Sequence, residues 1–285
     1  MSAPAEAIRI LAKWLMFRVL CLGNARRYHA LRGAAARAAA RCGGYERRQI
    51  AFLRHVLGEG AVAVDGGAGF GAYSAPMARL AGRSGRVIAF EPLPEVFAQL
   101  ERAMRRRANV SCRRQALSDR GAGAELHLPL LWGSLPEPAL ASIERPPGPH
   151  EACRVELVRL DALAGEIGRC DFVKLDVEGH EHEALRGAAG LIARERPLIQ
   201  LESNDLRRDG PGYRSFAEPL GYELCELTPG GELRPCAADA SGPNFYLVPS
   251  GWRPLDAASA ASAATWRSRV SSSLKAAITS ARGRM

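Results

Sequence analysis

Three kinds of pattern are missing from this sequence of 285 residues. Its seven cysteines show no paired spacing of the zinc-ribbon or redox type, and an odd number does not indicate a disulfide framework. The apolar stretch near the N-terminus is interrupted by Arg9, Lys13 and Arg18, so it predicts neither a transmembrane helix nor a good signal peptide. No nucleic-acid-binding motif and no interleaving of aromatic and basic residues occurs. We therefore expect a cytoplasmic protein that does not act on nucleic acid.

Acidic residues are scarce at both ends of the chain. Residues 1–48 hold ten Lys and Arg against two acids, and residues 250–285 hold six against one, so the net charge of +9 belongs to the ends. We predict a basic amphipathic helical extension over residues 1–48 and an Ala/Ser-rich basic tail with a short amphipathic helix over residues 250–285. Two interpretations stay open. These helices lie on the anionic inner face of the membrane, or they pack on the protein's own body or on a second subunit.

From Ala61 onward, within a domain expected to span residues 49–249, short apolar segments alternate with helical ones, which is typical of a parallel sheet with helices on both faces. We predict an α/β domain with a doubly wound, mostly parallel sheet of seven strands, the last two forming a hairpin-like pair. The predicted strands are residues 61–67, 86–92, 109–117, 171–177, 197–203, 222–227 and 244–249. The loop of residues 129–150 carries six prolines and is either a lid or substrate wall or a plain surface excursion.

A glycine-rich loop follows the first predicted strand. In "VAVDGGAGFGAYS" the strand ends at Asp65, and Gly67, Gly69 and Gly71 lie between it and a predicted helix. Glycines allow close approach of a ligand, and a helix N-terminus offers unpaired N–H groups. The spacing is compatible with a dinucleotide site. Asp65, however, would repel a pyrophosphate and attract the cationic amino-acid headgroup of S-adenosylmethionine, so the loop favours that cofactor.

Two further acids are candidate cofactor ligands. Glu91 ends the second predicted strand in "VIAFEP", where a carboxylate can accept hydrogen bonds from both hydroxyls of a ribose. Asp119 follows the third predicted strand in "ALSD", where it or a neighbouring backbone amide can meet an adenine edge. The alternative for Asp119 is a helix cap or turn residue.

Several motifs together resemble one known family. "VDGGAGFG", "VIAFEP", "ALSD", "RLDAL", "DFVKLDVEGHEHEALRGA" and "PLIQLES" occur in the order and spacing of the FkbM family of S-adenosylmethionine-dependent methyltransferases. The resemblance covers roughly residues 60–249. It implies a class I, Rossmann-like methyltransferase fold. It also implies O-methylation of a hydroxyl on a glycan, a glycolipid or a polyketide-type natural product. The chain departs from the family pattern at Gly66, where an apolar residue is usual, and at Gly69, where Asn is usual.

The acids after the fourth predicted strand are the candidate reaction centre. In this class of methyltransferase the end of that strand faces the transferred methyl group, and Asp176 lies there. Asp176 is predicted to accept the proton of the acceptor hydroxyl, or to orient that hydroxyl while His180 acts as the base. The alternative for His180 is a cap or surface residue. Lys174, inside the strand, is expected to pair with one of these acids.

A metal site is a second interpretation of the same region. Asp176, Glu178 and Glu202 are oxygen ligands at adjacent strand ends, where they contact the acceptor or bind a divalent ion such as Mg²⁺. The alternative is that acids in the first turn of the helix after "KLDV" only stabilise its N-terminus.

Two other functions remain open at this point. An NAD(P)-dependent oxidoreductase would use the same glycine loop and Glu91. A non-catalytic, cofactor-binding membrane adaptor would retain the pocket without the chemistry. Neither the acceptor nor the oligomeric state follows from the sequence.

Overall fold

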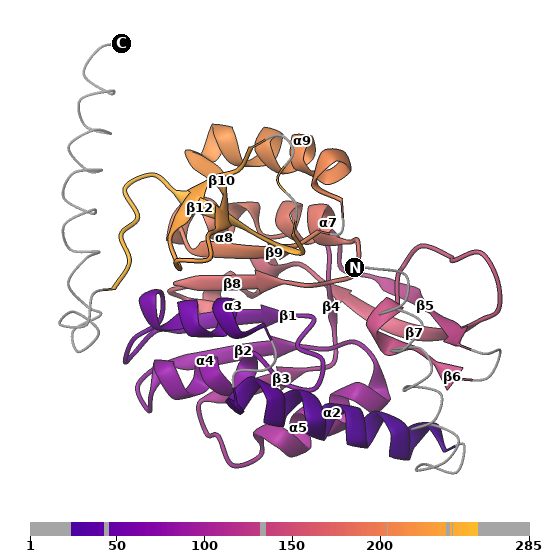
Figure 1. Ribbon diagram of the computed structural model, residues 1–285. Coiled ribbons are helices and arrows are strands. Elements are labelled where there is room, and N and C mark those ends of the chain that lie inside the picture. Colours follow the sequence, from indigo (N-terminus) through magenta and orange to yellow (C-terminus); the bar gives the residue numbers. More distant parts are fainter. Residues whose placement is uncertain are drawn as a thin grey trace.

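The central sheet has a strand at each of the seven predicted positions. The computed structural model describes residues 24–42, 46–131, 135–203, 205–237, 240 and 242–255. Within them the sheet has the strand order β11-β10-β12-β9-β8-β1-β2-β3 (Figure 1). Its strands are β1 (Val62–Gly66), β2 (Arg86–Phe90), β3 (Val110–Arg113), β8 (Phe172–Leu175), β9 (Leu198–Glu202), β10 (Tyr222–Leu227), β11 (Leu233–Pro235) and β12 (Asn244–Pro249).

The sheet is mixed and has eight strands in the described residues, not the predicted seven. Strands β3, β2, β1, β8 and β9 are parallel neighbours, whereas β12, β10 and β11 pair antiparallel. The extra strand, β11, has three residues and lies in the stretch predicted to be a connection. A strand this short at a sheet edge is defined by its pairing with β10, so sequence periodicity could not reveal it.

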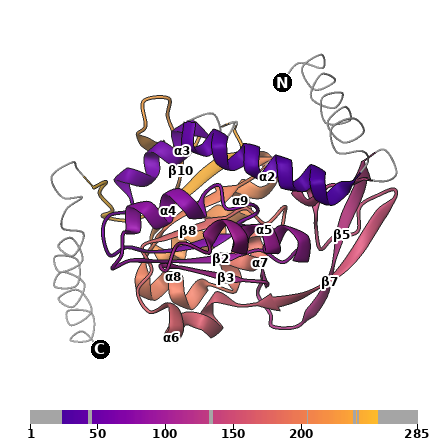
Figure 2. The same ribbon diagram turned by 90° about the horizontal axis from the view of Figure 1, so that it is seen from below.

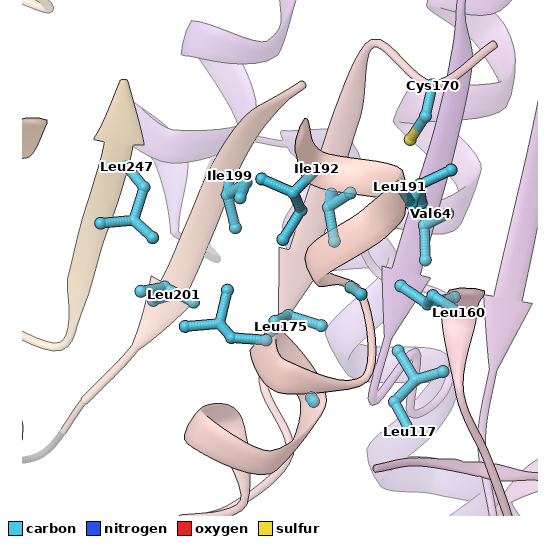
Figure 3. Close-up of a cluster of buried hydrophobic side chains, with 14 of the residues drawn as sticks. Val64, Leu117, Leu160, Cys170, Leu175, Leu191, Ile192, Ile199, Leu201 and Leu247 are labelled. Carbon is cyan, nitrogen blue, oxygen red and sulfur yellow. The ribbon is translucent and has the colours of Figure 1, made fainter. Parts of the chain in front are cut away.

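Helices cover both faces of the sheet, as the doubly wound fold requires (Figures 1 and 2). One face packs against α3 (Arg47–Phe52), α4 (Ser74–Ala81) and α5 (Pro94–Met104). The other packs against α7 (Glu181–Arg186), α8 (Ala189–Glu195) and α9 (Leu206–Ala217). Figure 3 shows this second layer, where Val64, Leu175 and Leu201 of the strands meet Leu191 and Ile192 of α8. Short turns of α6 (Ala164–Ile167), η2 (Leu53–His55), η4 (Leu160–Leu163) and η5 (Glu218–Leu220) connect the elements.

A second, smaller sheet has the order β4-β7-β5-β6. Its strands are β4 (Ala116–Leu117), β5 (Gly123–Leu131), β6 (Leu135–Pro136) and β7 (His150–Val158). The predicted strand 109–117 is therefore divided, because β3 stays in the central sheet while β4 pairs with β7. The proline-bearing segment folds back on β5 through η3 (Pro138–Leu140) and through paired backbone hydrogen bonds between His127 and Ser142. It therefore forms a wall beside the central sheet.

The described part of the N-terminal extension packs on the body. Helix α2 (Ala25–Cys42) lies beside α5, with Tyr28 and His29 buried (Figure 2). Arg37 also donates to the backbone oxygen of Phe70 at 3.2 Å. Residues 1–23 of the predicted extension and residues 256–285 of the predicted tail lie outside the described residues. Among the helices that the structure describes, none is long and apolar enough to cross a membrane.

Candidate active site

A cavity of about 520 Å³ opens at the carboxyl ends of β1, β2, β8 and β9. Parallel α/β sheets bind ligands at this edge because the loops after the strands leave a crevice there. The inner wall consists of the glycine loop, residues 91–93, residues 115–117, the acids that follow β8 and the acid that ends β9. The outer wall comes from Arg32 and Ala36 of α2 and from residues 138–143. The proline-bearing segment therefore lines the cavity.

The glycines of the loop are suited to their positions for different reasons. Gly67 has φ +69°, and a Cβ at this position would lie 1.7 Å from the backbone oxygen of Asp176, so only glycine allows the two loops to meet. Gly69 has φ +53°, and apart from its chain neighbours a Cβ there would meet no atom within 4 Å, which leaves that side of the loop open toward the cavity. Gly71 has φ +82°. The loop thus combines a fixed contact with the end of β8 and an exposed backbone for a ligand.

Asp65 lies behind the glycine loop and not on the cavity surface. Its side chain is wholly buried, accepts a hydrogen bond from Ser74 Oγ at 2.5 Å, and has Lys174 Nζ at 3.9 Å from Oδ1. Burial raises the pKa of Asp65, against the attraction of Lys174 and the hydrogen bond from Ser74. Asp65 is not among the residues that line the cavity. Its direct contact with a cofactor stays a prediction.

Glu91 lines the cavity at the position predicted for a ribose ligand. Its two carboxylate oxygens accept hydrogen bonds from the backbone nitrogens of Leu93 at 2.9 Å and Gly69 at 3.0 Å. Burial raises the pKa of Glu91 to about 7, although these two hydrogen bonds oppose the shift. Each oxygen keeps a second lone pair, so the carboxylate is oriented and can still accept from two hydroxyls.

Asp119 lies away from the cavity. It pairs with Arg186 at 3.2 Å, and this partner, against burial, holds the pKa of Asp119 below its usual value. The side chains of Gln115, Ala116 and Leu117 line the cavity in its place. The ion pair agrees with the turn interpretation, and the adenine contact of Asp119 stays a prediction.

Lys174 and three acids form the polar centre of the cavity. Lys174 Nζ lies 2.8 Å from Asp176 Oδ2, so the expected pairing is confirmed. Burial raises the pKa of Asp176, but the ammonium outweighs it and holds that pKa below its usual value. Burial and the hydrogen bond with Asp176 raise the pKa of Glu202, and burial with the charge of Asp176 raises that of Glu178 to about 8. At neutral pH, Asp176 is therefore the ionised carboxylate of the cluster.

The same acids were the candidate metal ligands. One oxygen each of Asp176, Glu178 and Glu202 lies within 4.8 Å of the others. Divalent ions bind ionised carboxylates. Here the Lys174 ammonium already neutralises Asp176, and the raised pKa values of Glu178 and Glu202 keep both acids protonated at neutral pH. Because the Lys174 ammonium already lies against Asp176, no reaction step is assigned to a metal.

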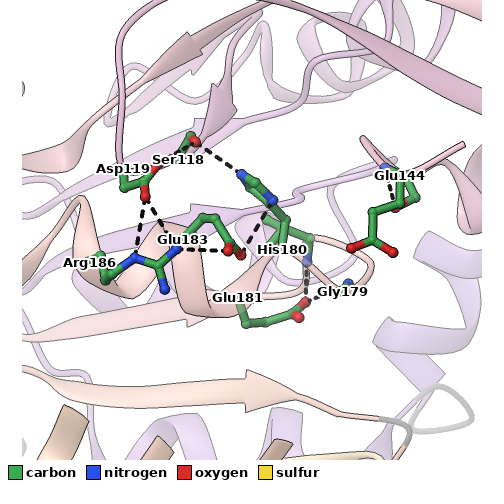
Figure 4. A network of polar contacts seen from close by, with 10 residues as sticks. Ser118, Asp119, Glu144, Gly179, His180, Glu181, Glu183 and Arg186 are labelled. Carbon is green, nitrogen blue, oxygen red and sulfur yellow. Dashed lines mark hydrogen bonds and ion pairs between the residues drawn. The ribbon is translucent and has the colours of Figure 1, made fainter. Parts of the chain in front are cut away.

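His180 lines the cavity at the start of α7, but its ring is already engaged on both sides (Figure 4). Nε2 lies 3.0 Å from Ser118 Oγ, and Nδ1 lies 3.5 Å from Glu183 Oε2. Burial lowers the pKa of His180, so the imidazole is neutral at pH 7. With Ser118 against Nε2 and Glu183 against Nδ1, neither ring nitrogen is free for an acceptor hydroxyl. This arrangement favours Asp176 over His180 as the proton acceptor.

Sequence reasoning missed three residues around the cavity. Tyr73 lines it, and Arg32 lines it from α2 while pairing with the buried Glu137. Glu46 accepts a hydrogen bond from the Tyr73 hydroxyl. No local pattern marks these residues, because the partners in these two contacts are 27 and 105 positions apart in the sequence.

Comparison with known proteins gives one family match. The family described as "Methyltransferase FkbM domain" matches residues 65–224. The chain is similar to a solved methyltransferase FkbM from Methylobacillus flagellatus KT, with 17% identity, TM-score 0.43, and coverage of 67% of this chain and 43% of that one. It thus spans less than half of that protein. No curated protein matches the chain.

Two further solved structures show lower identity. A precorrin-6y C5,15-methyltransferase from Geobacter metallireducens GS-15 has 15% identity, TM-score 0.40, and coverage of 71% of this chain and 85% of that one. Fibrillarin from Aeropyrum pernix, in complex with natively bound S-adenosyl-L-methionine, has 12% identity, TM-score 0.40, and coverage of 70% and 73%.

Proposed function

Because this chain belongs to the FkbM methyltransferase family, we propose that it transfers a methyl group from S-adenosylmethionine to a hydroxyl of a glycan, glycolipid or polyketide-type acceptor. The observation that carries the choice of cofactor is the charge of the cavity. Its carboxyl groups are Glu91, Asp176, Glu178 and Glu202, whereas its cations Lys174 and Arg32 are both ion-paired. With both cations already paired, no side-chain cation of the described lining is left to neutralise the pyrophosphate of NAD(P), whereas S-adenosylmethionine carries no phosphate and needs no such partner.

Each wall of the cavity has a role in this proposal. Glu91 accepts hydrogen bonds from the ribose hydroxyls, and the open backbone at Gly69 lies against the cofactor. The segment 115–117 lies beside the adenine. S-adenosylmethionine, when bound, supplies an electrophilic methyl group. The acceptor hydroxyl then lies at the carboxylate after β8, where Lys174 keeps Asp176 ionised.

Asp176 acts on the acceptor hydroxyl. An ionised carboxylate accepts a strong hydrogen bond from the hydroxyl and so orients an oxygen lone pair toward the methyl group. The methyl group would leave the sulfur of the donor for this oxygen, with S-adenosylhomocysteine as the leaving group, and the hydroxyl proton would pass to the Asp176 carboxylate. We expect Asp176→Asn to lower kcat by about 10²–10⁴-fold with little change in the Kd of S-adenosylhomocysteine. Equal and small effects on both quantities would remove Asp176 from the chemistry.

Two measurements test the proposed function. Calorimetric titration of the full chain with S-adenosylhomocysteine and, separately, with NADH identifies the cofactor. Transfer of labelled methyl from S-adenosylmethionine to a panel of sugars, glycolipids and hydroxylated polyketides, with and without EDTA, then identifies the acceptor class. We expect binding of S-adenosylhomocysteine only, and methyl transfer that survives EDTA. Binding of NADH alone would favour an oxidoreductase, and binding without transfer to any acceptor would favour a non-catalytic adaptor.

We also propose that the basic ends hold the protein against an anionic membrane. The charge distribution supports this proposal, since ten of the first 48 residues are Lys or Arg. Co-sedimentation of the full chain with phosphatidylglycerol vesicles, but not with phosphatidylcholine vesicles, is the expected result, and high salt should abolish it. Equal sedimentation with both would contradict an electrostatic contact.

A further inference from the structure

Polar side chains cross the central sheet in two neighbouring rows on the face that α3 and α4 cover. Strand register places Asp65 beside Lys174, Lys174 beside Gln200, and Gln200 beside Tyr246. In the next row toward the cavity, Asp176 follows the end of β8, and Glu202 pairs with Asn244 of the antiparallel strand β12. Residues two apart on a strand point to the same face, so both rows face the same layer. The rows are continuous with the cavity through Lys174, Asp176 and Glu202.

Lys174 is the cation at the centre of these rows. Its side chain is 4% exposed, and the ammonium lies 2.8 Å from Asp176 and 3.9 Å from Asp65. The ring of Tyr73 covers it, with Nζ 4.8 Å from the ring centroid. A buried ammonium is stable only where its partners are fixed, and an aromatic face adds attraction without adding another acid. The position of the Asp176 carboxylate therefore depends on the ring of Tyr73.

The hydroxyl of Tyr73 is held from two sides. It donates to Glu46 and accepts from Gln200 Nε2 at 3.0 Å. Glu46 has φ 37°, a left-handed conformation that is uncommon for a glutamate. It lies before residue 65, where the family match begins, so this anchor comes from outside the matched domain. Two hydrogen bonds at the hydroxyl leave the ring little freedom to leave Lys174.

We infer that Tyr73, anchored at its hydroxyl by Glu46 and Gln200, is a positioning residue that holds the Lys174–Asp176 ion pair in place at the acceptor end of the cavity. This inference rests on the proposed function, because Asp176 needs a fixed position only if it orients the acceptor. The segment before the family domain thereby contributes to the reaction without touching the reacting atoms. Tyr73 acts through Lys174, and Glu46 acts through Tyr73.

Because the sequence contains few lysines, the Lys174 side chain can be observed selectively by NMR. The sequence contains three lysines, Lys13, Lys174 and Lys275. In the full chain with Lys13→Arg and Lys275→Arg, lysine-selective ¹³Cε labelling reports on Lys174 alone by NMR. We expect Tyr73→Leu, which removes the ring, to shift and broaden this signal. The same variant should lower kcat by about 10–100-fold on the acceptor found in the panel, with little change in the Kd of S-adenosylhomocysteine.

Milder variants separate positioning from a loss of folding. Tyr73→Phe keeps the ring and loses the anchor, so its effects should be smaller than those of Tyr73→Leu. Glu46→Ala should resemble Tyr73→Phe, whereas Glu46→Gln keeps an acceptor for the hydroxyl and should restore both readouts. The matched control is Tyr222→Phe, which removes a buried hydroxyl that donates to the Pro197 backbone oxygen at 2.9 Å away from the cavity. It should change neither the Lys174 signal nor kcat.

The outcomes distinguish this inference from the proposed function. An unchanged Lys174 signal in folded Tyr73→Leu, or in Tyr73→Phe and Glu46→Ala if Tyr73→Leu does not fold, overturns the inference. An equal response in Tyr222→Phe also overturns it. If the wild-type chain does not bind S-adenosylhomocysteine, the proposed function fails and Tyr73 has no part in methyl transfer. The NMR comparison still decides whether Tyr73 holds Lys174.

Discussion

The same strands build both faces of the central sheet, but near the cavity one face carries apolar side chains and the other carries charged ones. Toward α7, α8 and α9, the strands contribute apolar residues such as Val64, Leu175 and Leu201 along their whole length. Toward α3 and α4, the neighbouring positions carry Asp65 and Lys174, which are also buried. Because side chains alternate along a strand, one strand can serve a core on one face and a site on the other. Apolar packing provides stability on the first face, whereas ion pairs fix the positions of charges on the second.

We expect Lys174→Met, on the polar face, to have the largest effect on stability and activity. This change removes the cation but keeps most of its volume, and it leaves Asp65 and Asp176 without their partner. Breaking a buried ion pair typically costs about 3–5 kcal/mol. We expect a loss of this order in urea unfolding at neutral pH, together with loss of methyl transfer. A variant as stable as the wild type would show that the polar face does not depend on this charge.

Leu201→Ala tests the apolar face in the same part of the sheet. Leu201 is wholly buried in the cluster of Figure 3, and truncation should cost about 3 kcal/mol through lost burial and a residual cavity. Because its side chain points away from the site, the Kd of S-adenosylhomocysteine should stay unchanged. Calorimetric titration of the folded variant checks this, and a large loss of affinity would mean that the two faces are not separable.

The smallest of the expected effects is on the pH dependence of stability, and it follows from Glu91. Burial raises its pKa in the folded protein from 4.5 to about 7, so the folded state binds a proton that the unfolded state has released. This contribution to stability is present below pH 4.5 and is lost as the pH rises through 7, by roughly 2 kcal/mol between pH 5 and 8. Glu91→Gln should flatten that part of the stability profile in urea unfolding. It should also weaken S-adenosylhomocysteine binding through the lost ribose acceptor, and an unchanged slope would contradict the burial argument.

Much of the fold was predictable because it depends on local patterns. Hydrophobic periodicity located the parallel strands, and it failed for β11 and for the division at Arg113, where pairing with distant segments defines the strand. Family motifs placed Glu91 and Asp176 at the cavity. The same motifs also made Asp65 a candidate cofactor ligand, and Asp119 either a cofactor ligand or a turn residue; the structure places Asp65 behind the glycine loop and Asp119 against Arg186.

The sequence by itself determined where the strands, the glycine loop and the acids after the strands would be, because each is encoded by neighbouring residues. Only the tertiary structure decided which acid keeps its charge and which residues enclose the cavity. Asp176 is ionised because β1, β8 and Tyr73 converge on Lys174, and Arg32 and Glu46 reach the site from segments that precede the matched domain. A charge in a buried site depends on every group within a few ångströms, and those groups are distant in the sequence.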